Sequence, residues 1–279
     1  MASLFMRFPG GKAKAFTMSY DDGVEQDIRL MEIMNKNGLK GTFNINAGLF
    51  APEGTVYPKG QIHRRMTQQQ IESLFKGSGQ EVAIHGLFHP FLEQLPPGRA
   101  EWEIVEDRRR LEEIFGGTVR GMAYPFGTTS SDVVQMVKNA GIVYARTTVS
   151  TEGFGISEDW LRLPATCHHN NPRLMELGEK FMKAQSQSSP MMFYLWGHSY
   201  EFEQNDNWNV IENFAEQISG QSDIWYATNI EIFDYILAYR QLRFNVNMTL
   251  VENPTNTDLY FAWQNKDYMV PAGKTLMID

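Results

Sequence analysis

The sequence has one cysteine, no long hydrophobic run and little positive charge. Cys167 has no partner for a disulfide within the chain, which is typical of a protein from a reducing compartment. No stretch approaches the ~18 apolar residues of a membrane span, and residues 1–11 lack the apolar core of a signal peptide. We therefore expect a cytoplasmic protein without a membrane partner, although a sequence from which a leader had been removed would look the same.

The scarcity of basic residues argues against a nucleic-acid partner. Lys and Arg number 25 against 33 Asp and Glu, which gives a formal net charge of −8. The one basic cluster, Arg108-Arg109-Arg110, is flanked by Glu and Asp and is typical of a solvated helix face, so few cations are available to neutralise phosphates. With 279 residues and 42% hydrophobic content, the chain can bury the core of one large domain with a small appendage. Its oligomeric state is open.

Strand-like and helix-like segments alternate along most of the chain, and this pattern predicts a parallel sheet with right-handed crossovers. About seven β-then-α units favour a distorted (β/α) barrel of about seven parallel strands over residues 1–240. The expected strands are 14–20, 40–46, 81–84, 119–124, 142–147, 191–196 and 224–228, and the expected helices are 24–37, 99–115, 130–139, 208–218 and a segment that begins after Thr67.

The pattern of expected secondary structure changes after Arg240. Residues 242–251, 258–263 and 275–278 read as short strands separated by turn sequences, with no helix between them. We expect residues 241–279 to form a small C-terminal β extension that packs on the barrel.

Two polar clusters follow predicted strands and offer metal ligands. Asp21 and Asp22 come before Gly23, which makes a bend cheap, and His85 and His89 follow another strand. One carboxylate and two imidazoles occupy three positions on Zn²⁺ and leave a fourth for water, as in hydrolytic sites. Each motif alone is weak, because Asp-Asp-Gly is also an ordinary turn and His-x-x-x-His an ordinary helix face. Their common position at strand ends favours a catalytic site.

Two further segments end at the same edge of the predicted sheet. Residues 122–127 contain Pro125 and Gly127, and main-chain N–H groups left free there can form an oxyanion hole; an aromatic turn packing on the core is the simpler alternative. The strand 191–196 delivers His198, which is the available acid for protonating a leaving amine near neutral pH, although a lone His after a strand is more often structural.

The remaining histidines are given other places. His168 and His169 follow Cys167 and look metal-like, but adjacent side chains project differently, so we assign both to the substrate rim. His63, beside two arginines, is most simply a surface residue.

These motifs resemble those of the polysaccharide deacetylases of carbohydrate esterase family 4, the NodB-homology domain, over roughly residues 14–240. Segment 17–23 is similar to the first family motif, usually T-F-D-D-G, and the resemblance makes Asp21 the base and Asp22 a metal ligand. His85 and His89 match the second motif, which supplies two imidazole ligands. The resemblance also implies a distorted (β/α) barrel.

The third family motif, usually R-P-P-Y-G, is altered here. Ala123 stands where the Arg would be, and that Arg normally restrains the catalytic Asp. We expect Arg120, Arg146 or Arg162 to replace it. The backbone N–H of Phe126 corresponds to the family's oxyanion donor.

The fifth motif, L-x-H, is similar to Trp196-Gly197-His198, so the resemblance makes His198 the general acid. Trp196 in place of Leu implies an altered acyl pocket, and we expect Trp196 and Tyr124 to contact substrate. Asp159-Trp160 is a candidate for the fourth motif.

The expected function is metal-dependent hydrolysis of an N-acetyl, or an O-acetyl, group on an amino sugar or oligosaccharide. Zn²⁺ is the expected metal, with Co²⁺, Ni²⁺ or Mn²⁺ open, because two His and one Asp accept all four. The altered third motif and Trp196 keep a second reading open, a hydrolase of a small linear or cyclic non-sugar amide. A third is an inactive carbohydrate-binding relative.

Overall fold

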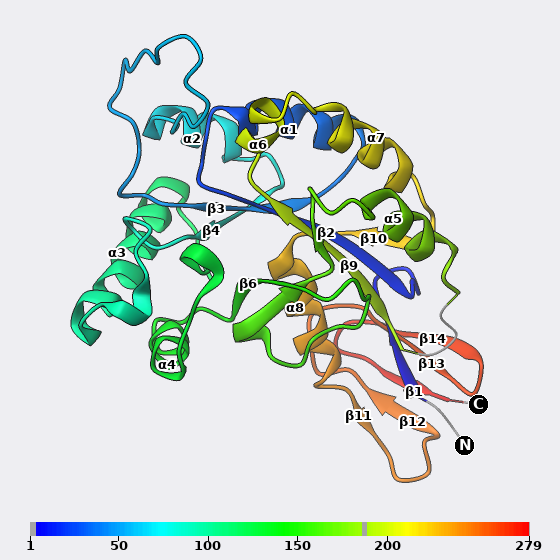
Figure 1. The fold of residues 1–279 in the computed structure, drawn as a ribbon. Coiled ribbons are helices and arrows are strands. Elements are labelled where there is room, and N and C mark those ends of the chain that lie inside the picture. Colours follow the sequence, from blue (N-terminus) through cyan, green and yellow to red (C-terminus); the bar gives the residue numbers. More distant parts are fainter. Residues whose placement is uncertain (1–3, 186–188, 279) are drawn as a thin grey trace.

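A barrel of parallel strands carries the fold, and the computed structural model describes residues 4–185 and 189–278 (Figure 1). At its centre lies β2, Lys14–Asp21, whose eight residues are all buried because strands and helices cover it on every side. The neighbouring strands pair with it and with one another in parallel: β3 (Gly41–Ile45), β4 (Glu81–Ile84), β5 (Gly121–Ala123), β6 (Tyr144–Ser150) and β9 (Met191–Gly197).

One short segment joins the two ends of this sheet. Its first part, β7 (Leu163–Ala165), pairs with β6, and its second part, β8 (Cys167–His168), pairs with β9. Between them the Thr166 N–H donates to the Tyr194 carbonyl at 2.8 Å. The segment 163–168 therefore occupies one position in the barrel, next to β6 and β9.

The predicted fold class is confirmed, but one strand has a different identity from the one expected. The segment predicted at 224–228 forms β10 (Ile224–Tyr226), which pairs only with the first half of β2. Counting β7 and β8 as one position and leaving β10 aside, the nine-stranded sheet has seven positions in the described chain. The seventh position belongs to 163–168, whose two short pieces lack the length of an ordinary strand pattern.

Helices connect the strands and cover the outside of the barrel (Figure 1). Five of them match the expected helices closely, whereas α5, α6 and α8 were not expected. Their bounds are α1 (Gln26–Lys36), α2 (Gln68–Phe75), α3 (Pro97–Phe115), α4 (Ser131–Asn139), α5 (Leu174–Lys183), α6 (Tyr200–Gln204), α7 (Asn209–Ile218) and α8 (Asn229–Tyr239), with short 3₁₀ turns η1 (Leu92–Gln94), η2 (Pro125–Gly127) and η3 (Trp160–Arg162).

Local signals in the sequence fix several helix ends. Thr67 caps α2 through a reciprocal capping box with Gln70, in which each side chain bonds the other's backbone N–H. On α1, Leu30, Met31 and Met34 are buried, whereas Ile28 is exposed. Two acidic residues on the inner faces of the helices, Asp27 on α1 and Asp107 on α3, are also buried.

The C-terminal strands form two small antiparallel sheets beside the barrel. One combines β1 (Leu4–Arg7) with β13 (Leu259–Trp263) and β14 (Lys266–Val270), so both ends of the described chain lie together (Figure 1). The other combines β11 (Arg243–Phe244), β12 (Leu250–Glu252) and β15 (Thr275–Met277). Val251, Phe261 and Val270 form a separate apolar cluster between them.

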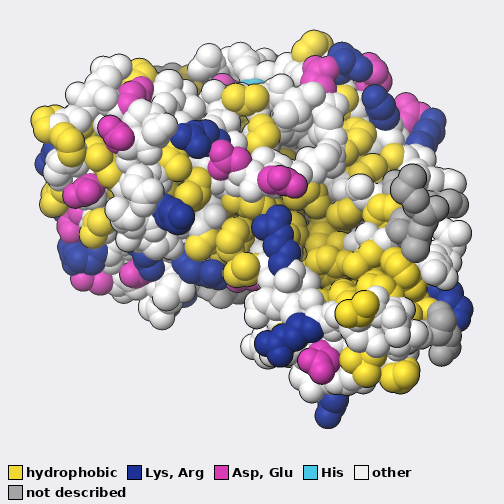
Figure 2. Space-filling view, turned by 90° about the horizontal axis from the view of Figure 1, so that it is seen from below, with side chains coloured by type: hydrophobic (Ala, Val, Ile, Leu, Met, Phe, Trp, Pro, Cys, Tyr) yellow, Lys and Arg dark blue, Asp and Glu magenta, His cyan; other side chains and the backbone are white. Residues whose placement is uncertain are grey.

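The outer surface differs from face to face. Figure 2 shows a hollow lined by hydrophobic side chains on the face seen from below, with charged side chains around it. Within the described residues, no helix has both the length and the apolar character needed to cross a membrane.

A close contact between neighbouring strands gives a test of the packing. A Cβ built on Gly121 would lie 2.1 Å from the Tyr144 hydroxyl, whereas one on Gly117 would meet nothing within 4 Å. We predict that Gly121→Ala lowers the free energy of unfolding by about 1–3 kcal/mol through overpacking. Gly117→Ala, the matched control, should change it by less than about 0.5 kcal/mol. Equal effects in urea denaturation would contradict the packing described here.

Candidate active site

The two acidic residues of the first motif lie at the end of β2, where the chain leaves the sheet. Asp22 has a positive φ of 87° and Gly23 one of 64°. The left-handed backbone at a non-glycine residue is unusual and marks a constrained turn. This turn lets both carboxylates, Asp21 and Asp22, face the same buried region, although neighbouring residues in a regular strand point to opposite sides.

Asp21 is held by two partners from other strands. Asn44 on β3 donates to Asp21 Oδ1 at 2.8 Å, and Arg146 on β6 donates to Oδ2. Both Asp21 and Arg146 are almost fully buried. Burial alone would raise the pKa of Asp21, but Arg146, followed by His85 and His198, outweighs it and lowers the pKa. Asp21 is therefore a carboxylate at neutral pH.

Asp22 is gripped by the loop that precedes α2. Arg65 donates to Asp22 Oδ1 at 3.0 Å, and His63 Nε2 lies 3.2 Å from Oδ2. Burial would raise the pKa of Asp22, but the bond to His63 and the charge of Arg65 hold it well below its usual range. His63 is exposed, as expected of a surface residue, but its ring also contacts the site through Asp22.

His85 presents one ring nitrogen to the two carboxylates. Its Nδ1 lies 2.7 Å from the Ala123 carbonyl and must donate to it, which leaves the lone pair on Nε2. Nε2 is buried without a hydrogen-bond partner and lies 3.7 Å from Asp21 Oδ2 and 4.0 Å from Asp22 Oδ1. Burial lowers the pKa of His85, so the ring stays neutral.

His89 completes a group of three possible metal ligands. One ligand atom each from Asp22, His85 and His89 lies within 4.8 Å of the others. Burial and the neighbouring His85 lower the pKa of His89 to about 4. Two neutral imidazoles, one with an orphaned and buried lone pair, and one carboxylate fit a divalent metal such as Zn²⁺.

Two buried carboxylates on the surrounding helices support the motifs from behind. Asp107 on α3 accepts the N–H of His85 at 2.9 Å and that of Ala47 at 2.7 Å. Asp27 on α1 accepts the Ser199 hydroxyl at 2.6 Å and the Val24 N–H at 3.1 Å. Burial raises the pKa of each to about 7. These residues tie strand ends together, and we did not identify them from the sequence, although Asp107 shares a helix face with apolar residues.

His198 lies on the other side of Asp21, after β9. Its Nε2 is 3.8 Å from Asp21 Oδ2, and its Nδ1 is 3.5 Å from Glu201 Oε1. Burial alone would lower the pKa of His198, but Glu201, Asp21 and Asp22 outweigh it and raise the pKa. His198 thus stands between two carboxylates, the arrangement that keeps a proton on an imidazole.

The adjacent histidines, His168 and His169, both contact Glu201 on α6. His168 Nε2 lies 3.1 Å and His169 Nε2 2.9 Å from Glu201 Oε2. His169 is only 1% exposed and packs against the ring of Tyr20, which corrects its assignment to the rim. His168 is partly exposed, and its Nδ1 accepts the Asn170 N–H at 3.1 Å, which places the proton of the neutral ring on Nε2.

The other two residues expected to contact substrate, Tyr124 and Trp196, are both buried. Tyr124 is buried and its hydroxyl donates to the Leu161 carbonyl at 2.9 Å, so its expected contact with substrate is not supported. Trp196 is also buried, with the Arg146 guanidinium 4.4 Å from its ring centre. Phe126 is exposed and has a positive φ of 59°, so its turn is constrained and its ring lies at the surface.

The three arginines expected to replace the Arg of the third family motif lie at different places in the fold. Arg146 reaches Asp21, as described above. Arg120 pairs with Asp234 on α8 at 3.0 Å, and Arg162 in η3 pairs with Asp159 at 3.3 Å. The Asp159-Trp160 dipeptide, a candidate for the fourth motif, therefore takes part in a surface turn, with Trp160 packed on Phe233.

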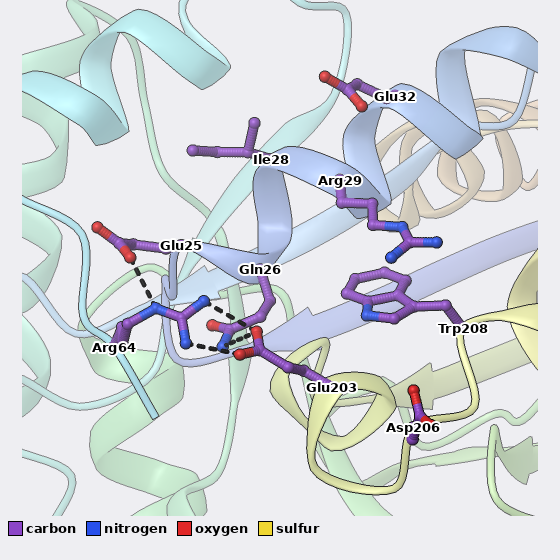
Figure 3. A pocket seen from close by; sticks show the side chains of 9 residues that line it. All are labelled: Glu25, Gln26, Ile28, Arg29, Glu32, Arg64, Glu203, Asp206 and Trp208. Carbon is purple, nitrogen blue, oxygen red and sulfur yellow. Dashed lines mark hydrogen bonds and ion pairs between the residues drawn. The ribbon is translucent and has the colours of Figure 1, made fainter. Parts of the chain in front are cut away.

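A further arginine fastens the loop that holds Asp22. Arg64 donates to Glu25 and, through both terminal nitrogens, to Glu203 on α6, each at 2.8 Å (Figure 3). These residues line a cavity of about 740 Å³ on the outer side of the loop. Since His63 and Arg65 beside it contact Asp22, the Arg64 cluster links the loop to the helix that follows His198.

Comparison with known proteins bears on the family and on the fold. Residues 9–145 match the family model described as polysaccharide deacetylase. The family resemblance seen in the motifs is thereby confirmed. No curated protein matches the chain.

Several solved structures are similar to this chain at low sequence identity. A Mycobacterium smegmatis protein, provisionally assigned as a polysaccharide deacetylase, is 16% identical over 84% of this chain and 93% of that one, with a TM-score of 0.60. A family 4 carbohydrate esterase from Streptomyces lividans, solved with acetate, is 16% identical over 76% and 90%, with a TM-score of 0.49.

A Streptococcus pyogenes deacetylase, also solved with acetate, is 21% identical over 52% of this chain, with a TM-score of 0.46. The match spans 61% of that protein's length. At these identities the likeness concerns the fold alone, and the Mycobacterium smegmatis match supports the barrel described above.

The buried pair between Asp21 and Arg146 gives a test of the site that needs no substrate. We predict that Arg146→Gln lowers the free energy of unfolding by about 3–5 kcal/mol, because it leaves a buried carboxylate unpaired. The loss should be smaller at pH 5 than at pH 8, since the pKa of Asp21 rises without Arg146 and protonation at low pH relieves the charge. Denaturant unfolding at the two pH values measures both effects.

Arg120→Gln is the matched control for this variant. Arg120 and Asp234 are partly exposed, so their pair should contribute about 1 kcal/mol or less. A loss as large as that of Arg146→Gln would remove the distinction between the two arginines.

Proposed function

We propose that this protein is a metal-dependent deacetylase that hydrolyses an N-acetyl, and by the same chemistry an O-acetyl, group of an amino sugar or oligosaccharide. The observation that carries the proposal is the meeting of five side chains from three strand ends: Asp21, Asp22, His85, His89 and His198. The match of residues 9–145 to the polysaccharide deacetylase family supports an acetylated sugar as substrate.

Asp22, His85 and His89 would hold the metal. A divalent ion bound there supplies Lewis-acid chemistry, which lowers the pKa of water and polarises an acyl carbonyl. Arg65 and His63 restrain Asp22 from its outer side, and the Ala123 carbonyl fixes the His85 ring. Such partners of metal ligands orient them before any metal binds.

Asp21 is the proposed base. As the water oxygen bonds to the acyl carbon, its proton passes to the carboxylate of Asp21. Arg146 and Asn44 keep this carboxylate ionised and fix its direction, because each donates to one of its oxygens. Arg146 on β6 thus takes the restraining role that the family gives to an Arg at the position of Ala123.

His198 is the proposed acid. Its Nε2, on the side of Asp21, gives a proton to the amine nitrogen as the carbon–nitrogen bond breaks, and Glu201 stabilises the charged ring through Nδ1. The backbone N–H of Phe126 is the proposed oxyanion donor, since the neighbouring N–H groups of Gly127 and Thr128 are used by the carbonyls of Tyr124 and Pro125.

The proposal is tested by assaying acetate release from N-acetyl chito-oligosaccharides and acetylated xylo-oligosaccharides, with hydrolysis of small ureides and imides followed in parallel. We predict release from an acetylated sugar, and a loss of at least about 100-fold in kcat for Asp21→Asn and for His198→Ala because each removes a proton-transfer group. Asp234→Asn, a carboxylate outside the site, should keep full activity.

Two outcomes would replace the proposal. A preference for ureides or imides would favour the small-amide alternative, for which the altered acyl pocket at Trp196 is the motive. Binding of a sugar without release of acetate under any divalent metal would favour the inactive carbohydrate-binding relative.

A further inference from the structure

Two phenyl rings at the candidate site are exposed in a way that the fold does not require. Phe91 is 37% and Phe126 48% exposed. The rings are stacked on each other, with centroids 3.8 Å apart and an angle of 10° between their planes. Each ring therefore has one covered face, and the pair keeps a flat apolar surface in contact with water, which costs free energy unless something binds there.

The pair is fixed directly beside a proposed metal ligand. Phe126 contacts the His89 ring edge-on, with centroids 4.5 Å apart. His89 and Phe126 both have a positive φ, and the turn after Phe126 is fixed because a Cβ on Gly127 would lie 2.3 Å from the Thr148 hydroxyl. The surroundings therefore hold Phe126 in a strained turn at the rim of the site.

Two other aromatic rings, those of the exposed Trp102 and the partly exposed Trp208, are each covered by an arginine. Arg99 lies 4.1 Å from the Trp102 ring centre, and Arg29 lies 4.4 Å from that of Trp208, as Figure 3 also shows for Arg29. In residues 4–185 and 189–278, no Lys or Arg lies over Phe91 or Phe126. This pair is thus left free for a neutral partner with an apolar face.

A second aromatic contact approaches the ligand group from Asp22. His63, which contacts Asp22, meets the Tyr200 ring edge-on at 4.9 Å between centroids. The Phe91–Phe126 pair contacts the ligand group through His89, and His63 contacts it through Asp22. A ligand that places one group at the metal ligands can therefore extend over the phenyl pair.

We propose that the Phe91–Phe126 pair is a stacking subsite for a pyranose ring next to the sugar that reacts, so that the substrate is an oligosaccharide and not a monosaccharide or a small amide. This inference rests on the proposed function and names its substrate class. A pyranose presents an apolar face of C–H groups, which packs on an aromatic ring as other flat ligands do. Phe91 is the better residue to test, because Phe126 also carries the proposed oxyanion donor.

The test compares Phe91→Leu with Phe91→Tyr. Leu keeps the apolar contact with Phe126 but has no ring face, whereas Tyr keeps the ring. Binding of N-acetylglucosamine and its β-1,4-linked tetramer is measured by calorimetry in a His198→Ala background, which prevents turnover. We expect Phe91→Leu to weaken tetramer binding by about 5- to 10-fold and leave the monomer unchanged, and Phe91→Tyr to bind both as the parent does.

The proposal is overturned if Phe91→Leu binds the tetramer as tightly as the parent, if it weakens monomer and tetramer equally, or if the parent binds neither sugar. Thermal unfolding of each variant shows whether the fold is kept, and Phe91→Tyr keeps the test valid if Leu destabilises the turn. The binding readout is independent of turnover. Ring-dependent tetramer binding without acetate release from the wild type would contradict the proposed function and support the subsite. Acetate release from the wild type with tetramer binding that does not depend on the ring would support the proposed function and contradict the subsite.

Discussion

The site depends on the neutralisation of two adjacent carboxylates that are buried together at the end of β2. A buried charge without a partner costs several kcal/mol, so Asp21 and Asp22 each require a cationic neighbour. Arg146 on β6 is the cation beside Asp21, and Arg65, from the loop before α2, is the cation beside Asp22, which His63 also contacts. The chain therefore brings two distant segments to the end of one strand, and the position of each carboxylate follows from its own partner.

The position of the missing family Arg illustrates how this arrangement is reached. Ala123 stands at that position on β5, and its carbonyl fixes the tautomer of His85. The charge that Asp21 needs comes from Arg146, on the neighbouring strand β6, where it pairs with Ala123 in the parallel register. Thus β5 orients His85, and the adjacent β6 supplies the cation beside Asp21. The buried guanidinium of Arg146 also packs on Trp196, which stands where the family motif usually has leucine.

The sequence predicts those parts of the fold that depend on local pattern. Strand alternation, the Thr67 capping box and the apolar face of α1 are encoded within a few residues, so the barrel and most helix ends could be predicted. The strand 163–168 could not, because it is made of two short pieces that pair with different neighbours.

For the site, the candidate metal ligands and His198 could be predicted because each follows an apolar strand. Their partners were not, since a residue such as His63 lies 41 positions from Asp22, and nothing in its neighbourhood signals that contact. The sequence could not rank three arginines, of which Arg146 contacts Asp21, whereas Arg120 and Arg162 pair with other carboxylates. Glu201 was missed for another reason: it is close to His198 in sequence, but only the fold shows that three imidazoles approach it.

The most direct measurement of the central claim, that three strand-end ligands grip one divalent ion, is a calorimetric titration of the metal-free protein with Zn²⁺. The wild type and Asp234→Asn should bind one equivalent per chain, because Asp234 pairs with Arg120 and belongs to no group of possible metal ligands in the described residues. His85→Ala should lose this binding, since it removes the buried lone pair that faces both carboxylates. Unchanged binding in His85→Ala, or no saturable binding in the wild type, would contradict the account.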